Sequence, residues 1–171
     1  MKRIIQQLFK NSRSSDNGIF FNEIEKILGF KPLKIEIYEK AFIHRSTNKL
    51  DENGNAISYE RLEFLGDAML SSVIAAHLFK KVPTGDEGYL TKMRSKIVSR
   101  EHLNELGRDL NLIQFIKSKV PSNHFGENIH GNIFEALVGA IYLDRGYLFC
   151  EKFIQKRVLI PYVDIPKLEG K

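Results

Sequence analysis

The sequence is poor in the residues that build disulfide frameworks and thiolate metal sites. Cys150 is the one cysteine among 171 residues, which excludes an internal disulfide and a cysteine-based zinc site. The start of the chain lacks the features of a signal peptide. No uninterrupted apolar run approaches the roughly 18 residues of a membrane span. We therefore expect no membrane partner and a cytoplasmic location, where a free thiol stays reduced.

Strand-like alternation of polar and apolar residues is also missing, and the pattern that remains is helical. Apolar residues recur near a period of 3.6 between loops rich in Gly, Pro, Asn and Ser. We expect Ser58 to cap the longest helix and Gly107 to end a shorter one. The pattern predicts an all-α fold of seven or eight helices, near residues 20–28, 33–42, 58–80, 87–97, 100–107, 132–144 and 147–161.

Charge is unevenly distributed along this basic chain. The net charge is +5 and the isoelectric point about 9.2. Residues 51–79 hold five acids and one base, whereas residues 80–100 hold six bases and two acids. A local acidic cluster in a basic protein suits a polyanionic partner whose phosphates meet metal ions at the acids. From charge alone, the interpretation as a mildly basic protein whose charged side chains are simply solvated stays open.

The stretch "ERLEFLGDAML" places acids inside an otherwise apolar helix. Glu60, Glu63 and Asp67 lie at positions i, i+3 and i+7, so they share one helical face. No base within this helix lies on that face. Gly66, among the acids, lowers helix propensity by about 1 kcal/mol relative to Ala. We interpret that cost as a sign that another backbone or a ligand approaches closely there.

A second apolar helix, in "GNIFEALVGA", carries a related pattern. Asn132, Glu135 and Gly139 repeat the i, i+3, i+7 spacing. If the two faces pack together, oxygen ligands converge from Glu63, Asp67, Asn132 and Glu135. Such ligands without His or Cys favour Mg²⁺, with Mn²⁺ able to substitute, over Zn²⁺. Two such ions about 4 Å apart can support phosphodiester hydrolysis, and we expect no organic cofactor.

Two other interpretations of these acids stay open at this point. Acids on an amphipathic helix are commonly its solvated face. Carboxylate-bridged di-iron bundles also use helical acids, but they require a Glu-x-x-His motif. The residues three positions after Glu63 and Glu135 are Gly66 and Val138, which makes a di-iron site a poor match.

Four blocks in order resemble the ribonuclease III family of double-stranded-RNA endonucleases. These blocks are "AFIHRS" (41–46), "ERLEFLGDAML" (60–70), "DEGYLTKMRSKIVS" (86–99) and "GNIFEALVGAIYLDRGY" (131–147). The resemblance implies a helical catalytic domain over residues 20–162, after an N-terminal extension (1–19) and before an interdomain linker (163–171). A double-stranded-RNA-binding domain usually follows that linker in the family and is absent from this chain.

The resemblance also implies an activity and its residues. Glu63, Asp67 and Glu135 match catalytic metal-binding acids, and Glu60 and Glu87 match further acids near the scissile phosphate. The family cuts both strands of double-stranded RNA, as in rRNA and mRNA processing, and leaves 5′-phosphate and 3′-hydroxyl ends.

The resemblance further implies a symmetric homodimer in which Phe64 contacts the partner subunit. On the exposed acidic stripe, such an apolar side chain can be buried by a partner.

One departure from the family pattern bears on activity. Asn132 stands where the family usually has Asp, so the metal site presents three carboxylates instead of four. We expect cleavage to survive with a greater need for divalent metal. The alternative is a silent homologue that keeps the fold for RNA binding or for a structural role.

Basic side chains suggest where RNA would lie. Lys92, Lys96 and Arg100 fall at i, i+4 and i+8, and on one helix face they could contact phosphates without reading bases. A solvated helix face is an equally good interpretation of that spacing. His44 could serve as an acid or base, but a lone His without a placed partner is more often a structural hydrogen bonder.

Overall fold

The computed structural model of the chain describes residues 18–162, and the predicted extension up to residue 17 and the predicted linker (163–171) lie outside the described residues. A first helix covers residues 18–28. The elements that follow are α2 (Ile35–Lys40), η1 (Arg45–Thr47), α3 (Glu60–Lys81), α4 (Glu87–Ile97), α5 (Arg100–Asp109), η2 (Leu112–Phe115), η3 (Ser122–His124), α6 (Ile129–Arg145), α7 (Tyr147–Ile154), the π-helical turn η4 (Gln155–Leu159) and α8 (Ile160–Tyr162). Within residues 18–162 the only β pairing is two isolated bridges, so the all-α prediction is confirmed.

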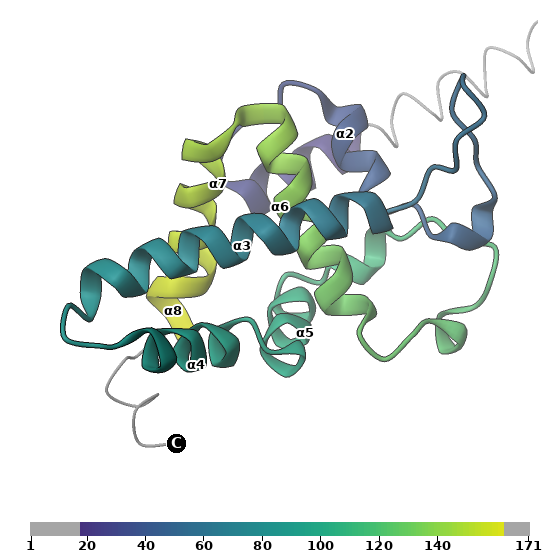
Figure 1. Cartoon of the computed structure of the whole chain (residues 1–171). Coiled ribbons are helices and arrows are strands. Elements are labelled where there is room, and N and C mark those ends of the chain that lie inside the picture. The colour runs from purple at the N-terminus through teal and green to yellow at the C-terminus, as the bar shows by residue number, and fades with distance from the viewer. Residues whose placement is uncertain (1–17, 163–171) are drawn as a thin grey trace, which may run out of the picture.

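Helices α3 and α6 form the centre of the fold, where they cross in direct contact (Figure 1). The crossing brings backbone against backbone because each helix has a glycine there. A Cβ atom on Gly66 would overlap the carbonyl oxygen of Glu135 and lie 3.0 Å from the Gly139 nitrogen. A Cβ atom on Gly139 would likewise overlap the carbonyl oxygen of Leu62. The expectation of a close approach at Gly66 is therefore confirmed, and the approaching group is another backbone.

A single apolar cluster surrounds this crossing. The buried side of α3 consists of Leu62, Gly66, Leu70, Val73, Ile74 and Leu78. Nearly the whole middle of α6 is buried as well, as expected of a helix covered on several sides by neighbours. Cys150 is fully buried in this cluster, in agreement with its predicted place in the core.

Two predicted helix ends are wrong. Tyr59 rather than Ser58 precedes the first turn of α3, and neither caps it with a side chain; the Ser58 hydroxyl lies 3.4 Å from a Glu60 carboxylate oxygen. Gly107 does not end α5, which continues to Asp109. A Cβ atom on Gly107 would overlap the His130 carbonyl, so this glycine permits α5 to pack on α6 instead of stopping the helix.

The short helix α2 is held by a residue from the far end of α6. Asp144 accepts hydrogen bonds from the backbone amides of Leu33 and Lys34, both at 2.9 Å, and from the Tyr38 hydroxyl at 2.9 Å. These two amides lie just before the first turn of α2, so Asp144 ties the start of this helix to the end of α6. The helix begins at Ile35, and Leu33, predicted to lie in its apolar stripe, is exposed.

Helix α3 qualifies the expectation about membranes. By length and composition alone it is long and apolar enough to cross a membrane. Core helices of soluble proteins pass the same test, and one side of α3 is buried against α6 here.

Candidate active site

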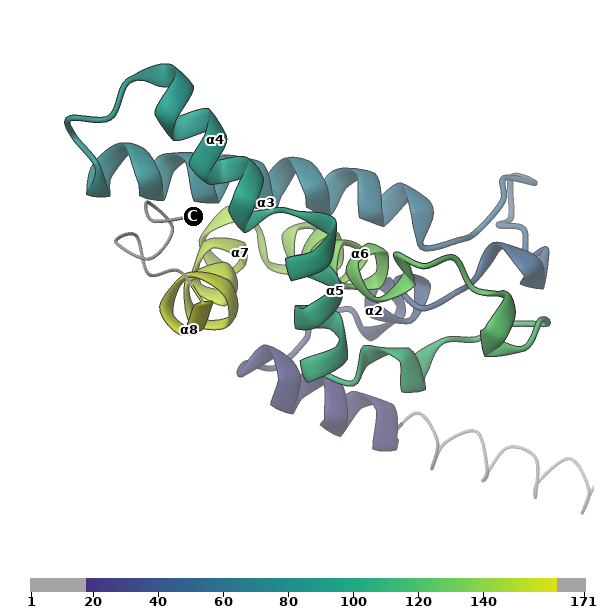
Figure 2. The same cartoon turned by 90° about the horizontal axis from the view of Figure 1, so that it is seen from below.

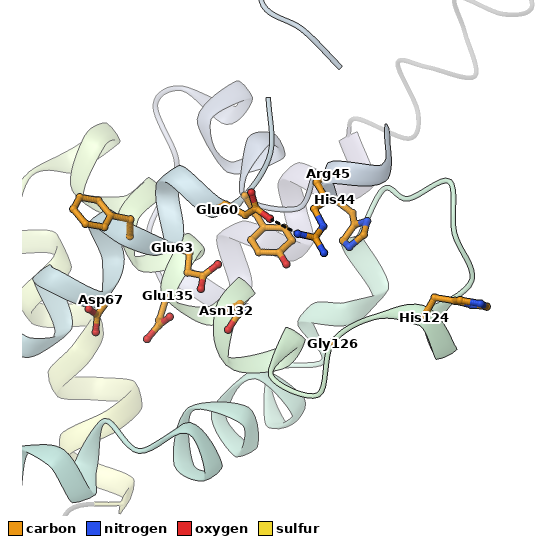
Figure 3. Close-up of a pocket in the computed structure, with 11 residues that line it drawn as sticks. His44, Arg45, Glu60, Glu63, Asp67, His124, Gly126, Asn132 and Glu135 are labelled. Carbon is orange, nitrogen blue, oxygen red and sulfur yellow. Dashed lines mark ion pairs between the residues drawn. The ribbon is translucent and has the colours of Figure 1, made fainter. Parts of the chain in front are cut away.

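The crossing of α3 and α6 gathers oxygen-bearing side chains around two adjoining cavities. The larger cavity, of about 600 Å³, and the smaller, of about 360 Å³, share four lining residues: Glu63, Asp67, Asn132 and Glu135. Figure 3 shows Glu63 and Asp67 coming from α3, and Asn132 and Glu135 coming from α6. Glycines at the crossing let the helices approach closely enough for these side chains to meet. The structure thus brings together all four predicted metal ligands.

In the part of the chain that the structure describes, the acids at the centre of this site lack a basic ion-pair partner. Among the described residues, Glu63, Asp67 and Glu135 form no ion pair within 4.0 Å, and the nearby ion pair joins Glu60 to Arg45 at 3.7 Å. Glu63 and Glu135 are also half-buried. Uncompensated carboxylates withdrawn from water are costly, so an ordinary solvated face does not describe Glu63 and Glu135, whereas Asp67 is exposed.

This arrangement changes the acidity of two of the acids. Burial raises the pKa of Glu135 to about 8; the charges of Asp67 and Glu63 add to the rise, and Arg100 opposes it. Burial also raises the pKa of Glu63, with added repulsion from Glu60 and Asp67. Strongly shifted carboxyl groups in a cleft are typical of functional sites. A cation placed among them would relieve the repulsion.

The donor chemistry fits a hard divalent cation. Carboxylate and amide oxygens suit Mg²⁺ or Mn²⁺, and both prefer such ligands to nitrogen or sulfur. In the part of the chain that the structure describes, no three His, Cys, Asp or Glu side chains already form a closed metal-binding group. An open site with few protein ligands is nevertheless what Mg²⁺ prefers, because it keeps several waters and takes the remaining ligands from phosphate.

The three predicted RNA-binding bases do not share one helix face. Helix α4 ends at Ile97, and the Ser99 side chain caps the start of α5, where Arg100 is the first residue. Figure 2 shows the chain turning between these two helices. As a result Arg100 lines the smaller cavity beside Glu135, whereas Lys92 and Lys96 remain on α4. The prediction from the i, i+4, i+8 spacing that these three bases share one helix face is therefore wrong.

Two other predicted residues lie outside the central group. Glu87 lines a separate cavity of about 520 Å³ near the end of α3 and accepts a hydrogen bond from the Thr91 hydroxyl at 2.9 Å. Its role near the scissile phosphate stays a prediction. Phe64 is 81% exposed, an unusual position for a large apolar side chain next to an acidic cleft.

Several lining residues were not predicted for this site, because they come from loops and from helical turns too short to show periodicity. The larger cavity is also lined by Arg45, Tyr59, His124 and Gly126, together with His44. The sequence offered only weak support for a role of His44 in the chemistry. Figure 3 shows His44 and Arg45 towards one end of the row of acids and Asp67 at the other. The block "AFIHRS" was the available signal for two of them.

A helical fold with an acidic cleft between two crossing helices suits a metal-dependent nuclease domain, and comparison with known proteins assigns the chain to a family. A family model described as Ribonuclease-III-like matches residues 34–162. The chain belongs to the ribonuclease III family, which confirms the predicted resemblance.

Curated relatives agree with this assignment. The chain is 72% identical over 167 residues to Ribonuclease 3 of Flavobacterium psychrophilum, covering 98% of this chain and 68% of that protein. It is 70% identical to Ribonuclease 3 of Zunongwangia profunda, covering 94% and 66%, and 42% identical to that of Bacteroides fragilis, covering 98% and 56%. The chain thus spans between about half and two thirds of the length of these relatives.

Solved structures share the fold. The nuclease domain of ribonuclease III from Campylobacter jejuni, described with a region involved in dimer formation, superposes with a TM-score of 0.71 at 28% identity, covering 82% of this chain and 96% of that one. Dicer from Pichia stipitis gives a TM-score of 0.56 at 27% identity, covering 80% and 56%. The predicted endonuclease-domain fold is therefore confirmed.

Proposed function

We propose that this protein is a metal-dependent endonuclease that hydrolyses phosphodiester bonds of double-stranded RNA. Family membership supports the reaction class, and the α3–α6 crossing supports the site. The observation that carries the proposal is the group of Glu63, Asp67 and Glu135, drawn from two helices around common cavities with no basic partner within 4.0 Å among the described residues. Such a group is built to receive cations that arrive with a phosphate.

Four side chains would hold the metal ions. Glu63, Asp67 and Glu135 supply negative oxygens, and Asn132 supplies a neutral one, to hold Mg²⁺ ions, with Mn²⁺ as a substitute. When bound, such ions lower the pKa of water and stabilise charge on a leaving oxygen. In the reaction a water oxygen bonds to phosphorus and the bond from phosphorus to the 3′ oxygen breaks, which leaves a 5′-phosphate and a 3′-hydroxyl.

Positive charge on both sides of the acids supports a polyanionic substrate. Arg45 lines the larger cavity and Arg100 the smaller one. Both are exposed and can contact phosphates next to the one that is cut. Contacts of this kind bind the backbone without reading bases, which suits A-form RNA recognised by its shape. Lys92 and Lys96 on α4 stay candidates for more distant phosphates.

A symmetric homodimer is part of the proposal. Phe64 is highly exposed and borders a cavity of about 700 Å³ whose apolar lining includes Ile57, Leu65 and Leu143. An isologous contact would bury Phe64 of each subunit against the other. Two acidic sites in one dimer suit cleavage of both strands of a duplex. We expect this dimer to act in the cytoplasm.

Cleavage of a long RNA duplex, titrated with Mg²⁺ and with Mn²⁺, tests the proposal. The wild type is expected to cut, and Asn132→Asp is expected to lower the Mg²⁺ concentration for half-maximal rate by on the order of tenfold, because ligand charge sets affinity. Asn53→Asp, which adds the same carboxylate in an exposed loop, is the matched control. A wild type that stays inert at every metal concentration, beside an Asp variant that cuts, would identify a silent homologue instead.

A further inference from the structure

His44 occupies a position for which a histidine is an unusual choice. It precedes η1, and its side chain accepts a hydrogen bond from the Ser46 backbone amide at 3.2 Å. Such N-cap positions are usually filled by Ser, Thr, Asp or Asn, whose single short side chain satisfies the amide. An imidazole carries a second nitrogen on the far side of the ring, which capping does not require.

The surrounding hydrogen bonds determine which ring nitrogen carries the proton. The Ser46 backbone N–H points at Nδ1 and cannot turn away, so Nδ1 is an acceptor. The Ser46 hydroxyl lies 2.8 Å from the same nitrogen and accepts a hydrogen bond from the Lys119 amide at 3.1 Å. It also lies 3.0 Å from the Ser118 hydroxyl. Because a neutral imidazole has one acceptor and one donor, the proton is assigned to Nε2.

The ring is held firmly at the edge of the active-site cleft. Its centroid lies 5.1 Å from that of Phe125 and 6.1 Å from that of Tyr59. His44 is 8% exposed and lines the larger cavity with Glu60, Glu63 and Asn132 (Figure 3). Nε2 has no hydrogen-bond partner among the described residues and is not closed off from solvent. The ring therefore borders the cleft, and its Nε2–H, unlike Nδ1, is not used by any hydrogen bond within the described residues.

We propose that His44 binds the RNA backbone, donating a hydrogen bond from Nε2–H to an oxygen of a nucleotide next to the cleaved one. The acceptor is a ribose 2′-hydroxyl or a phosphate oxygen. His44 is thus a binding residue and takes no part in moving protons during cleavage. Burial and the neighbouring Arg45 lower its pKa, in keeping with a neutral donor. This inference rests on the proposed function, because it requires RNA in this cleft.

Two substitutions separate the capping role from the donor role. In His44→Asn, the side-chain oxygen replaces Nδ1 as the cap, and the distal donor is lost. In His44→Gln, the amide N–H₂ reaches the position of Nε2, and the cap is lost. We expect His44→Asn to keep the cap, to lose only the stability that the ring gains by packing on Phe125 and Tyr59, and to need about three to ten times more duplex RNA for half-maximal single-turnover cleavage in Mg²⁺. We expect His44→Gln to keep its RNA affinity and lose thermal stability.

A purely structural His44 would give the opposite result. His44→Asn would then behave as the wild type towards RNA, and the inference would be overturned. Equal losses of affinity in His44→Asn and His44→Gln would also overturn it. If His44→Asn does not fold, His44→Ser replaces it, since Ser caps equally well and likewise lacks the distal donor.

Modified duplexes identify the acceptor. A 2′-deoxy substitution removes the ribose hydroxyl, and a methylphosphonate replaces a charged phosphate oxygen, each placed on either side of the cut. The modification at the contacted oxygen should weaken binding by the wild type and leave His44→Asn unaffected. If neither modification behaves in this way, no such contact exists. A wild type that neither binds nor cuts duplex RNA would refute the proposed function itself, whereas failure of the His44 tests alone leaves that function standing.

Discussion

Replacing Glu135 with Gln is expected to stabilise the metal-free protein at alkaline pH while removing its affinity for divalent metal. The folded chain raises the pKa of Glu135 from its usual 4.5 to about 8. Between these two values the folded state holds a proton that the unfolded state has released. The free energy of unfolding of the wild type therefore falls as pH rises through this window. Gln cannot ionise, so the free energy of unfolding of the variant does not decrease in this way.

The size of the effect follows from the shift. Each pH unit within the window changes the free energy of unfolding by up to about 1.36 kcal/mol. From pH 5 to pH 8 the upper limit is about 4 kcal/mol, and water at the half-buried carboxyl group reduces it to about 2–3 kcal/mol. We expect the stability advantage of Glu135→Gln over the wild type to grow by that amount across the range.

Urea unfolding at pH 5, 6.5 and 8 with a chelator present measures this difference. Glu52→Gln, which removes an exposed loop carboxylate, provides the control and should show no such trend. An advantage of Glu135→Gln that is the same at pH 5 and at pH 8 would refute the reasoning from burial and like-charge repulsion.

Metal binding should release the proton that Glu135 holds. A divalent ion requires the ionised carboxylate, so affinity should rise with pH until about 8, with up to one proton released per binding event below that pH. Titration calorimetry in buffers of different ionisation enthalpy counts the proton. Glu135→Gln should lose both the binding and the proton release.

Three further substitutions test the fold and the dimer. Gly66→Ala should cost about 3 kcal/mol or more of unfolding free energy, because its Cβ overlaps backbone that cannot move aside; Gly18→Ala, with open space around it, should cost nothing in the same urea assay. Asp144→Ala removes the acceptor of three hydrogen bonds and should lower the thermal midpoint by an amount equivalent to about 1–2 kcal/mol, whereas unchanged stability would contradict its anchoring role. Phe64→Glu should give monomers in analytical ultracentrifugation, while Phe79→Glu, at another exposed Phe of α3, should stay dimeric; identical behaviour of the two variants would count against the proposed interface.

The central part of the site could be predicted from the sequence because it depends on helical geometry. A period of 3.6 residues fixes which side chains share a face, so Glu63 with Asp67, and Asn132 with Glu135, follow from spacing alone. Gly66 and Gly139 then indicated where two helices could touch. The helix crossing that they allow is what brings the two faces to one cavity.

The rim of the site could not be predicted in this way. His44 and Tyr59 reach the cleft from positions just before a helix, and His124 from the end of a single short helical turn, where no periodicity relates one residue to the next. The sequence predicted separate helices near residues 87–97 and 100–107 but not the angle between them, so the regular spacing of bases did not reveal that Arg100 lies beside Glu135. These placements arise from contacts between segments distant in the chain.

The sequence by itself determined the helices, the acidic faces on two of them, the glycines that let those faces approach and the family to which the chain belongs. The tertiary structure alone decided that Glu135 is withdrawn from water beside two other acids, that the charge of Arg100 counteracts the rise in the pKa of Glu135, and that His44 lines the same cleft. The physical reason is that helical periodicity is local, whereas burial, repulsion and hydrogen bonding across a cleft depend on which distant segments the packed core brings together.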